Sequence, residues 1–89
     1  MSNNLKDHVY YNIIIRDMEK HVEKEFLKSG RLLSINIDIE FFDSNLNENL
    51  LDVRTSIEKK SKDTLFLKTI LKEDQNILTQ ATAIWSKEI

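Results

Sequence analysis

The chain has 89 residues, of which 40% are hydrophobic and 31% are charged. A chain of this length forms one domain, and we expect residues 1–89 to fold as a single unit with a small core. Its 13 basic and 15 acidic residues are interspersed, which argues against nucleic acid as a partner. No apolar run approaches the roughly 20 residues that cross a bilayer, so a membrane partner is not expected.

The absence of cysteine excludes disulfides, thiolate metal sites and a cysteine nucleophile. The polar N-terminus lacks the apolar segment of a secretory signal, and we expect a cytoplasmic protein. His8 and His21 do not have the spacing of a zinc site, so neither a metal nor a cofactor is predicted. A small core without a disulfide or a metal commonly gains stability by association. We therefore expect a homo-oligomer.

The first expected element is an amphipathic helix over about residues 7–28. Its apolar residues recur every four positions, which is typical of a helix that is buried on one side: Tyr10, Ile14, Met18, Val22 and Phe26. The opposite surface is predicted to be charged and solvated, and it includes Asp17; His21 is likewise predicted to lie on the surface. Gly30, the single glycine, is interpreted as the left-handed residue that commonly follows a helix.

Four strands are expected, over about residues 33–42, 50–58, 64–72 and 77–86. Each alternates apolar and polar residues, which indicates one buried face. The connections are short, and this favours antiparallel pairing. Phe66 and Ile70 add apolar weight to the second face of the third strand, where a partner subunit could cover them. In the first two strands the apolar face is predicted to hold Ile35, Ile37, Ile39 and Phe41, and Leu51, Val53, Thr55 and Ile57. In the third strand one face holds Leu65, Leu67, Thr69 and Leu71. In the fourth strand one face holds Thr79, Ala81, Ala83 and Trp85 and the other holds Leu78, Gln80, Thr82 and Ile84.

This order of elements indicates an α+β protein and fits both the hotdog fold and cystatin-like folds. Residues 8–19 (HVYYNIIIRDME) favour the hotdog fold, because they resemble a segment of acyl-CoA thioesterases of the 4-hydroxybenzoyl-CoA type. That segment commonly reads GHVNN, an apolar stretch, Arg, and an aromatic–Glu pair. The direct matches are His8, Val9, Arg16 and Glu19.

Residues 35–42, 47–55 and 75–85 are similar to later strands of the same family. The resemblance implies a hotdog-like fold, in which one long N-terminal helix is wrapped by a four-stranded antiparallel sheet. Family members usually carry a further strand before the helix, which ends in a catalytic Asp. Asn4 stands at that spacing here and the first strand is missing, so the resemblance implies an N-terminally shortened or degenerate member.

The implied activity is hydrolysis of an acyl-CoA thioester, with Asp7 and His8 as candidate catalytic residues at the helix start. Asp7 is also a standard helix N-cap, and the capping interpretation is favoured over catalysis. His8 has the alternative of a local hydrogen bond. The resemblance further implies that the substrate, including the coenzyme A phosphates, contacts Asn12, Arg54, Lys59, Lys60 and Lys62.

The alternative function is a non-catalytic acyl-binding or dimerisation module of the same fold that has lost the catalytic carboxylate. Aromatic residues are expected either to line an acyl tunnel or to fill the core: Tyr10, Phe26, Phe41, Phe42, Phe66 and Trp85.

Overall fold

The computed structural model describes residues 9–41 and 46–88, without the side chain of Glu48. Within these residues one α-helix precedes an antiparallel sheet, so the predicted α+β class is confirmed. The elements are α1 (Val9–Phe26), β1 (Gly30–Ile39), the 3-10 turn η2 (Glu48–Leu50), β2 (Leu51–Lys60), β3 (Thr64–Glu73) and β4 (Asn76–Lys87).

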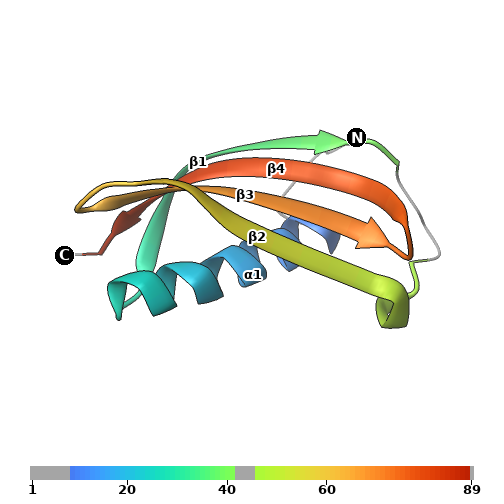
Figure 1. Cartoon of the computed structure of the whole chain (residues 1–89), viewed down its shortest axis with the longest axis horizontal. Coiled ribbons are helices and arrows are strands. Elements are labelled where there is room, and N and C mark those ends of the chain that lie inside the picture. The colour runs from blue at the N-terminus through green and yellow to red at the C-terminus, as the bar shows by residue number, and fades with distance from the viewer. Residues whose placement is uncertain (1–8, 42–45, 89) are drawn as a thin grey trace, which may run out of the picture.

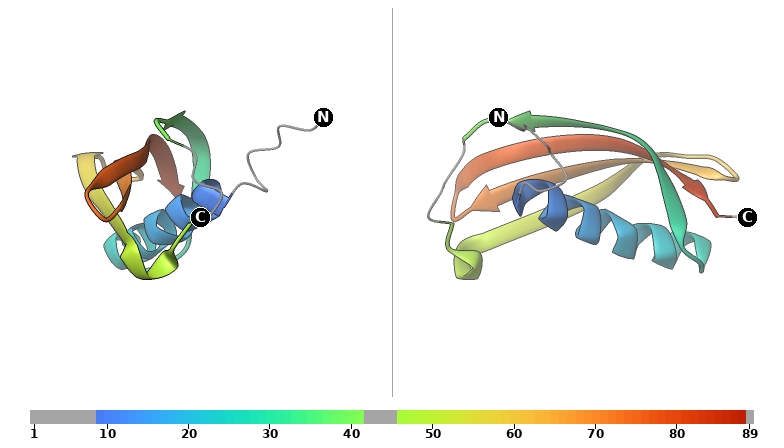
Figure 2. Two further views of the ribbon diagram at one scale, coloured as in Figure 1. Left: turned by 90° about the vertical axis from the view of Figure 1, so that its right-hand side faces the viewer. Right: turned by 180° about the vertical axis from the view of Figure 1, so that it is seen from behind.

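The four strands form one sheet in the order β1-β4-β3-β2, and every neighbouring pair is antiparallel. Helix α1 runs along the concave face of this sheet (Figure 1). Seen along the helix in Figure 2, the strands curl around one side of α1, and β1 and β2 form the two edges. The opposite, convex face of the sheet is not covered by the helix, and we call it the outer face.

The core lies between α1 and the concave face of the sheet. The predicted helix stripe is confirmed, because Tyr10, Ile14, Met18 and Val22 are all fully buried. One apolar cluster joins most of this stripe to the inward-facing residues of β3 and β4, and a smaller cluster surrounds Tyr10. The residues of β3 and β4 that were predicted to share one face are the buried ones: Leu65, Leu67, Thr69, Leu71, Thr79, Ala81, Ala83 and Trp85.

The strand pairing has three irregularities, so the sides on which the side chains lie do not follow simple alternation along the whole of each strand. The register shifts between Leu32 and Ser34 in β1, between Ile57 and Lys59 in β2, and opposite the Leu71/Lys72 step of β3. Each leaves one extra residue and reverses the faces of the residues beyond it. The shift in β2 places Lys59 opposite Phe66 on the outer face and Lys60 opposite Leu65 on the inner face.

The expected bounds change accordingly. Residues 59–60 were predicted to belong to a connection but continue β2, whereas the first strand begins at Gly30 and ends before Phe41. Phe41 and Ile39 were predicted to face the core, yet they are 59% and 41% exposed. The Tyr10 hydroxyl of the helix donates to the Phe41 carbonyl at 3.1 Å, so the first turn of α1 meets the backbone of this segment while the two side chains remain exposed.

The end of α1 corrects the interpretation of Gly30. The left-handed residue is Leu27, with φ 60°, and its N–H still donates to the Glu23 carbonyl at 2.8 Å. Gly30 does not have positive φ. It is instead the first residue of β1, where a Cβ would clash with Cγ1 of Val22 and lie 3.1 Å from the Ser86 carbonyl oxygen. Gly30 therefore allows β1 to start in direct contact with the helix.

Candidate functional site

The two residues predicted to be catalytic, Asp7 and His8, lie outside the described residues. The helix is described from Val9 onward, and Asn12 is exposed in its first turn. Lys60, at the end of β2, contacts Glu25 near the other end of the helix. Glu25 is 13 residues after Asn12, which is about 20 Å along the helix at 1.5 Å per residue. Within one chain, the structure does not bring Asn12 together with the predicted phosphate-binding lysines.

The predicted basic residues of β2 and the following turn point in different directions. Arg54 lies on the outer face, is 80% exposed, and contacts the Asp52 carboxylate at 3.0 Å. Lys60 lies on the helix side and pairs with Glu25. Lys62 is exposed in the β2–β3 turn. Lys59 lies on the outer face, opposite Phe66, so the four basic residues do not all point to one place.

A shallow hollow of about 340 Å³ lies beside this hairpin. Its rim is polar and basic, with Lys59 and Lys60, and its floor includes Phe66 and Ile84 from the outer face. The apolar floor continues a patch on β3 and β4. The hollow thus brings Lys59 and Lys60 next to an apolar surface at the end of the β2–β3 hairpin.

The aromatic residues do not line one cavity. Tyr10 and Trp85 are buried in different clusters of the core, and the Trp85 Nε1–H donates to the Met18 sulfur at 3.4 Å. Phe66 lies on the outer face and Phe41 is exposed. Phe42 lies outside the described residues. Phe26 is partly buried and packs against the cluster that contains Trp85. The core interpretation therefore holds for Tyr10, Phe26 and Trp85.

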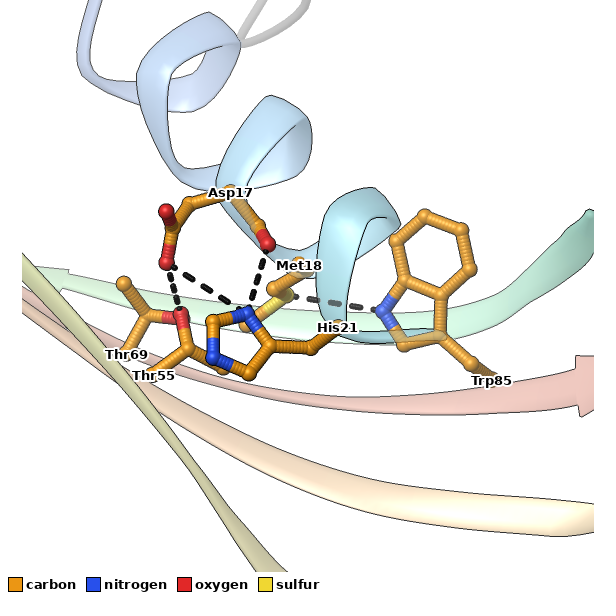
Figure 3. Close-up of polar contacts among 6 residues, drawn as sticks. All are labelled: Asp17, Met18, His21, Thr55, Thr69 and Trp85. Atoms are coloured by element: carbon orange, nitrogen blue, oxygen red, sulfur yellow. Dashed lines mark hydrogen bonds and ion pairs between the residues drawn. The ribbon is translucent and has the colours of Figure 1, made fainter. Parts of the chain in front are cut away.

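A polar cluster that sequence reasoning missed lies between α1 and the sheet (Figure 3). The Thr55 hydroxyl of β2 donates to the Asp17 carboxylate at 2.6 Å and lies 2.7 Å from the Thr69 hydroxyl of β3. Thr69 is fully buried, and the Asp17 side chain is 24% exposed. Asp17 was predicted to lie on the solvated face, and this was wrong. We call Asp17, His21, Thr55 and Thr69 the Asp17 cluster.

The hydrogen-bond chemistry sets the direction of the protons in this cluster. An ionised carboxylate only accepts, so Thr55 uses its single proton on Asp17. The Thr69 hydroxyl must then donate to the Thr55 oxygen. The chain Thr69 to Thr55 to Asp17 thus gives both inward-facing hydroxyls a partner and holds the carboxylate in a fixed position.

His21 completes the cluster one helical turn after Asp17. Its Nδ1 lies 2.9 Å from the Asp17 carbonyl oxygen and 3.7 Å from the Asp17 carboxylate. Because a carbonyl oxygen only accepts, Nδ1 carries the proton, and in the neutral ring Nε2 has the available lone pair. The His21 side chain is 38% exposed, so it is half-buried rather than the free surface residue that was predicted. The pair can therefore work as a base that reaches solvent.

Two signals in the sequence could have revealed this cluster. Thr55 and Thr69 are the polar residues at predicted inward-facing positions of adjacent strands, and a hydroxyl there requires a partner. Asp17 and His21 are four residues apart and border the apolar stripe, so they share one flank of the helix. The sheet curls around this flank of the helix and covers it. Helical periodicity alone does not indicate that the flank is covered.

Among residues 9–41 and 46–88, no group of three or more histidine and carboxylate side chains is placed to hold a metal ion. Nor does any helix in this part of the chain have the length and apolar character needed to cross a membrane. Comparisons with protein-family models, with curated proteins and with solved structures give no match to this chain.

Proposed function

We propose that the chain has a hotdog-like fold and hydrolyses an acyl-CoA thioester in the cytoplasm, with the Asp17 cluster as its base. The observation that carries this proposal is a carboxylate–imidazole pair fixed at the helix–sheet boundary and still open to solvent. The arrangement of one helix along the concave face of an antiparallel sheet is compatible with the hotdog fold. The resemblance of residues 8–19 to the thioesterases supports the same substrate class.

In the proposed reaction, His21 Nε2 takes a proton from water as the water oxygen attacks the thioester carbonyl carbon. The C–S bond then breaks, and the imidazolium returns the proton to the leaving thiolate. The Asp17 carboxylate, 3.7 Å from Nδ1, stabilises the imidazolium. Thr55 acts as a positioning residue, because its hydroxyl fixes the Asp17 carboxylate.

The location of the basic hairpin is compatible with a coenzyme A substrate. Lys60 contacts Glu25, which lies four residues after His21 on the same helix, or about 6 Å along its axis. The hairpin amines are thus displaced from the proposed base along the α1–β2 side of the molecule. We propose Lys60 and Lys62 as the phosphate contacts.

The test is hydrolysis of a panel of short-chain and long-chain acyl-CoAs by the wild type and by His21→Gln, with release of free thiol as the readout. We expect His21→Gln to lower kcat by about 10²-fold or more, as for loss of a general base. Lys20→Gln, a substitution on the exposed side of the same helix, is the matched control and should retain wild-type turnover.

Asp7→Ala is measured in the same assay, because Asp7 is the catalytic residue that the family resemblance implies. A large loss for Asp7→Ala together with full activity of His21→Gln would move the site to the start of the helix. Wild-type turnover equal to that of buffer across the whole panel would rule out the enzyme. The unfolding midpoint of each variant separates loss of activity from loss of fold.

The second candidate function is a non-catalytic acyl-binding or dimerisation module. Exposed apolar side chains on the sheet and beyond its edge favour it, including Leu33 at 52% and Phe41 at 59% exposure. A thioether analogue of an acyl-CoA, which cannot be hydrolysed, distinguishes the candidates by calorimetry. Binding of the analogue without turnover of the matching thioester would select the module, whereas binding with turnover would select the enzyme.

A further inference from the structure

The outer face of the sheet gathers basic residues that are scattered along the sequence. Strand pairing identifies its members, because each lies beside a residue that alternates with the buried set. The charged residues of this face are Arg31, Arg54, Lys59, Lys68 and Lys72, with Asp38 and Asp52. Five basic and two acidic residues give the face a net charge of +3, whereas the whole chain has −2. The interspersed order of charges in the sequence argued against nucleic acid, but folding places an excess of positive charge on one surface.

Most of these basic groups form no ion pair with the described residues. Arg54 is the exception, since it contacts Asp52 at 3.0 Å. Within the described part of the chain, no carboxylate pairs with Arg31, Lys59, Lys68 or Lys72. These four groups are therefore available to an anionic partner.

Basic and neutral polar side chains occupy different halves of the face. The half formed by β2 and β3 has Arg54, Lys59, Lys68 and Lys72. The half formed by β1 and β4 has amides and hydroxyls, apart from Arg31 near the start of β1 and Asp38 near its end. Its neutral polar residues are Ser34, Asn36, Gln80 and Thr82. One half thus suits phosphate groups, and the other suits groups that exchange neutral hydrogen bonds.

An apolar platform lies between the two halves, near the β2–β3 hairpin. Phe66 of β3 and Ile84 of β4 are direct cross-strand neighbours, and Lys59 lies beside Phe66. Both apolar residues line the hollow of about 340 Å³ at this hairpin. Ile84 is 37% exposed, so the platform is open to solvent. A planar base can stack on such an aromatic surface while the adjacent lysine contacts its phosphate.

A polar recess of about 160 Å³ lies next to this platform. Its lining residues are Asn36, Asp38, Lys68, Gln80, Ala81 and Thr82. Phe66 and Lys68 are two residues apart in β3, so the platform and the recess are about 7 Å apart along the strand. The amides donate and accept hydrogen bonds, as the edge of a base requires, and the Asp38 carboxylate accepts from a base with an amino group, such as cytosine.

The polarity and the curvature of the face both favour a single strand of nucleic acid. An anionic lipid surface would bury the polar recess without partners for its amides. The face is convex (Figure 2), and a rigid, flat partner contacts only the crest of such a surface. A flexible single strand can follow the curve, and its unpaired bases are free to stack.

We propose that the outer face binds single-stranded nucleic acid. The phosphates lie along the β2–β3 half against Lys59, Lys68 and Lys72, one base stacks on Phe66, and the neighbouring base enters the polar recess. The Asp17 cluster lies on the other face of the sheet and stays open, so this binding does not depend on the proposed hydrolysis. A second copy of the chain on the outer face would compete with the strand.

Fluorescence anisotropy of a labelled oligocytidine strand of about 12 nucleotides tests the proposal, with RNA and DNA strands measured separately. Dissociation constants are measured between about 50 mM and about 200 mM salt. Lys68→Gln should weaken binding and lower the slope of log affinity against log salt by about 0.7, because one phosphate contact is lost. Phe66→Leu should weaken binding by at least about fivefold through lost stacking, but should leave the salt slope unchanged.

Lys20→Gln is the matched control, because it removes the same charge from the exposed side of α1. It should retain the wild-type affinity and salt slope, and circular dichroism of each variant shows whether the fold is kept. The proposal is overturned if neither strand binds, or if folded Lys68→Gln and Phe66→Leu both bind like the wild type. Binding to vesicles of equal phosphatidylserine and phosphatidylcholine, without binding to either strand, would assign the face to a lipid surface instead.

Discussion

At the scale of single residues, Gly30 shows how close packing constrains the sequence. Its missing Cβ leaves room for Val22 Cγ1 and for the Ser86 carbonyl oxygen, 3.1 Å from the Cβ position. We predict that Gly30→Ala lowers the free energy of unfolding by about 1–3 kcal/mol, the usual cost of overpacking a tight site. Urea unfolding followed by circular dichroism measures the change.

The proposed clash can be isolated by a double-mutant cycle. Val22→Ala removes the methyl groups that the new Cβ would meet, so the effect of Gly30→Ala should be smaller in the Val22→Ala background by about 1 kcal/mol. Additive effects of the two substitutions would show that the clash does not account for the loss. Ser29→Ala, one residue earlier and exposed, is the control and should be nearly neutral.

The Asp17 cluster could be predicted only in part from the residues of the sequence. The sequence pattern identified Thr55 and Thr69 as inward-facing, but it did not indicate which group would satisfy their hydroxyls. That group is a carboxylate on the helix flank, 38 residues from Thr55 along the chain. Such a contact depends on how far the sheet curls around α1, which is a property of tertiary packing. From the sequence, Thr55 and Thr69 could be noticed only as two polar residues among apolar ones. The candidate base that they hold in place could not be predicted.

At the scale of elements, the helix and the strand faces were predictable because each has a strong period. The four-residue repeat from Tyr10 to Val22 and the alternation in β3 both correspond to fully buried residues. The bulge in β2 was not predictable, because the residues beyond it, Lys59 and Lys60, are both polar and give no apolar signal of the reversed faces. In β2 this exchanges the faces of Lys59 and Lys60, and so determines which lysine meets Glu25.

The C-terminal end of α1 gives the prediction at this scale. Leu27 has φ 60° and is 88% exposed, so its side chain contributes little packing to offset the left-handed conformation. The left-handed conformation costs an L-residue about 1–2 kcal/mol, and glycine removes this cost. Glycine also lowers the free energy of unfolding by about 0.5–1 kcal/mol, because its unfolded state has more conformational freedom. We predict that Leu27→Gly raises the free energy of unfolding by about 0.5–1 kcal/mol.

Lys28→Gly is the matched control for this change. Lys28 is also exposed and lies one residue further along, but its φ is not positive. Glycine there gives only the entropic loss, so we expect a decrease of about 0.5–1 kcal/mol. Chemical denaturation of both variants under one condition gives the comparison. Stabilisation by both substitutions, or by neither, would contradict the assignment of Leu27 as the strained residue.

At the scale of the whole molecule, the distribution of apolar surface connects folding to association. One face of the sheet is covered by α1, while the other presents Phe66 and Ile84 to solvent in a single copy. A dimer formed through that face would contribute to the stability of each chain, because the unfolded chain cannot form the contact. Association through that face therefore predicts that stability depends on protein concentration.

For a dimer that unfolds to two separate chains, a tenfold increase in protein concentration should raise the free energy of unfolding by about 1.4 kcal/mol per dimer. Urea unfolding curves of the wild type should shift to higher midpoint as the concentration rises. Ile84→Glu, which places a charge among the exposed apolar side chains of that face, should show a smaller shift. Equal midpoints for the wild type at all concentrations would contradict a dimer whose folding and association are linked, because mass action requires the shift.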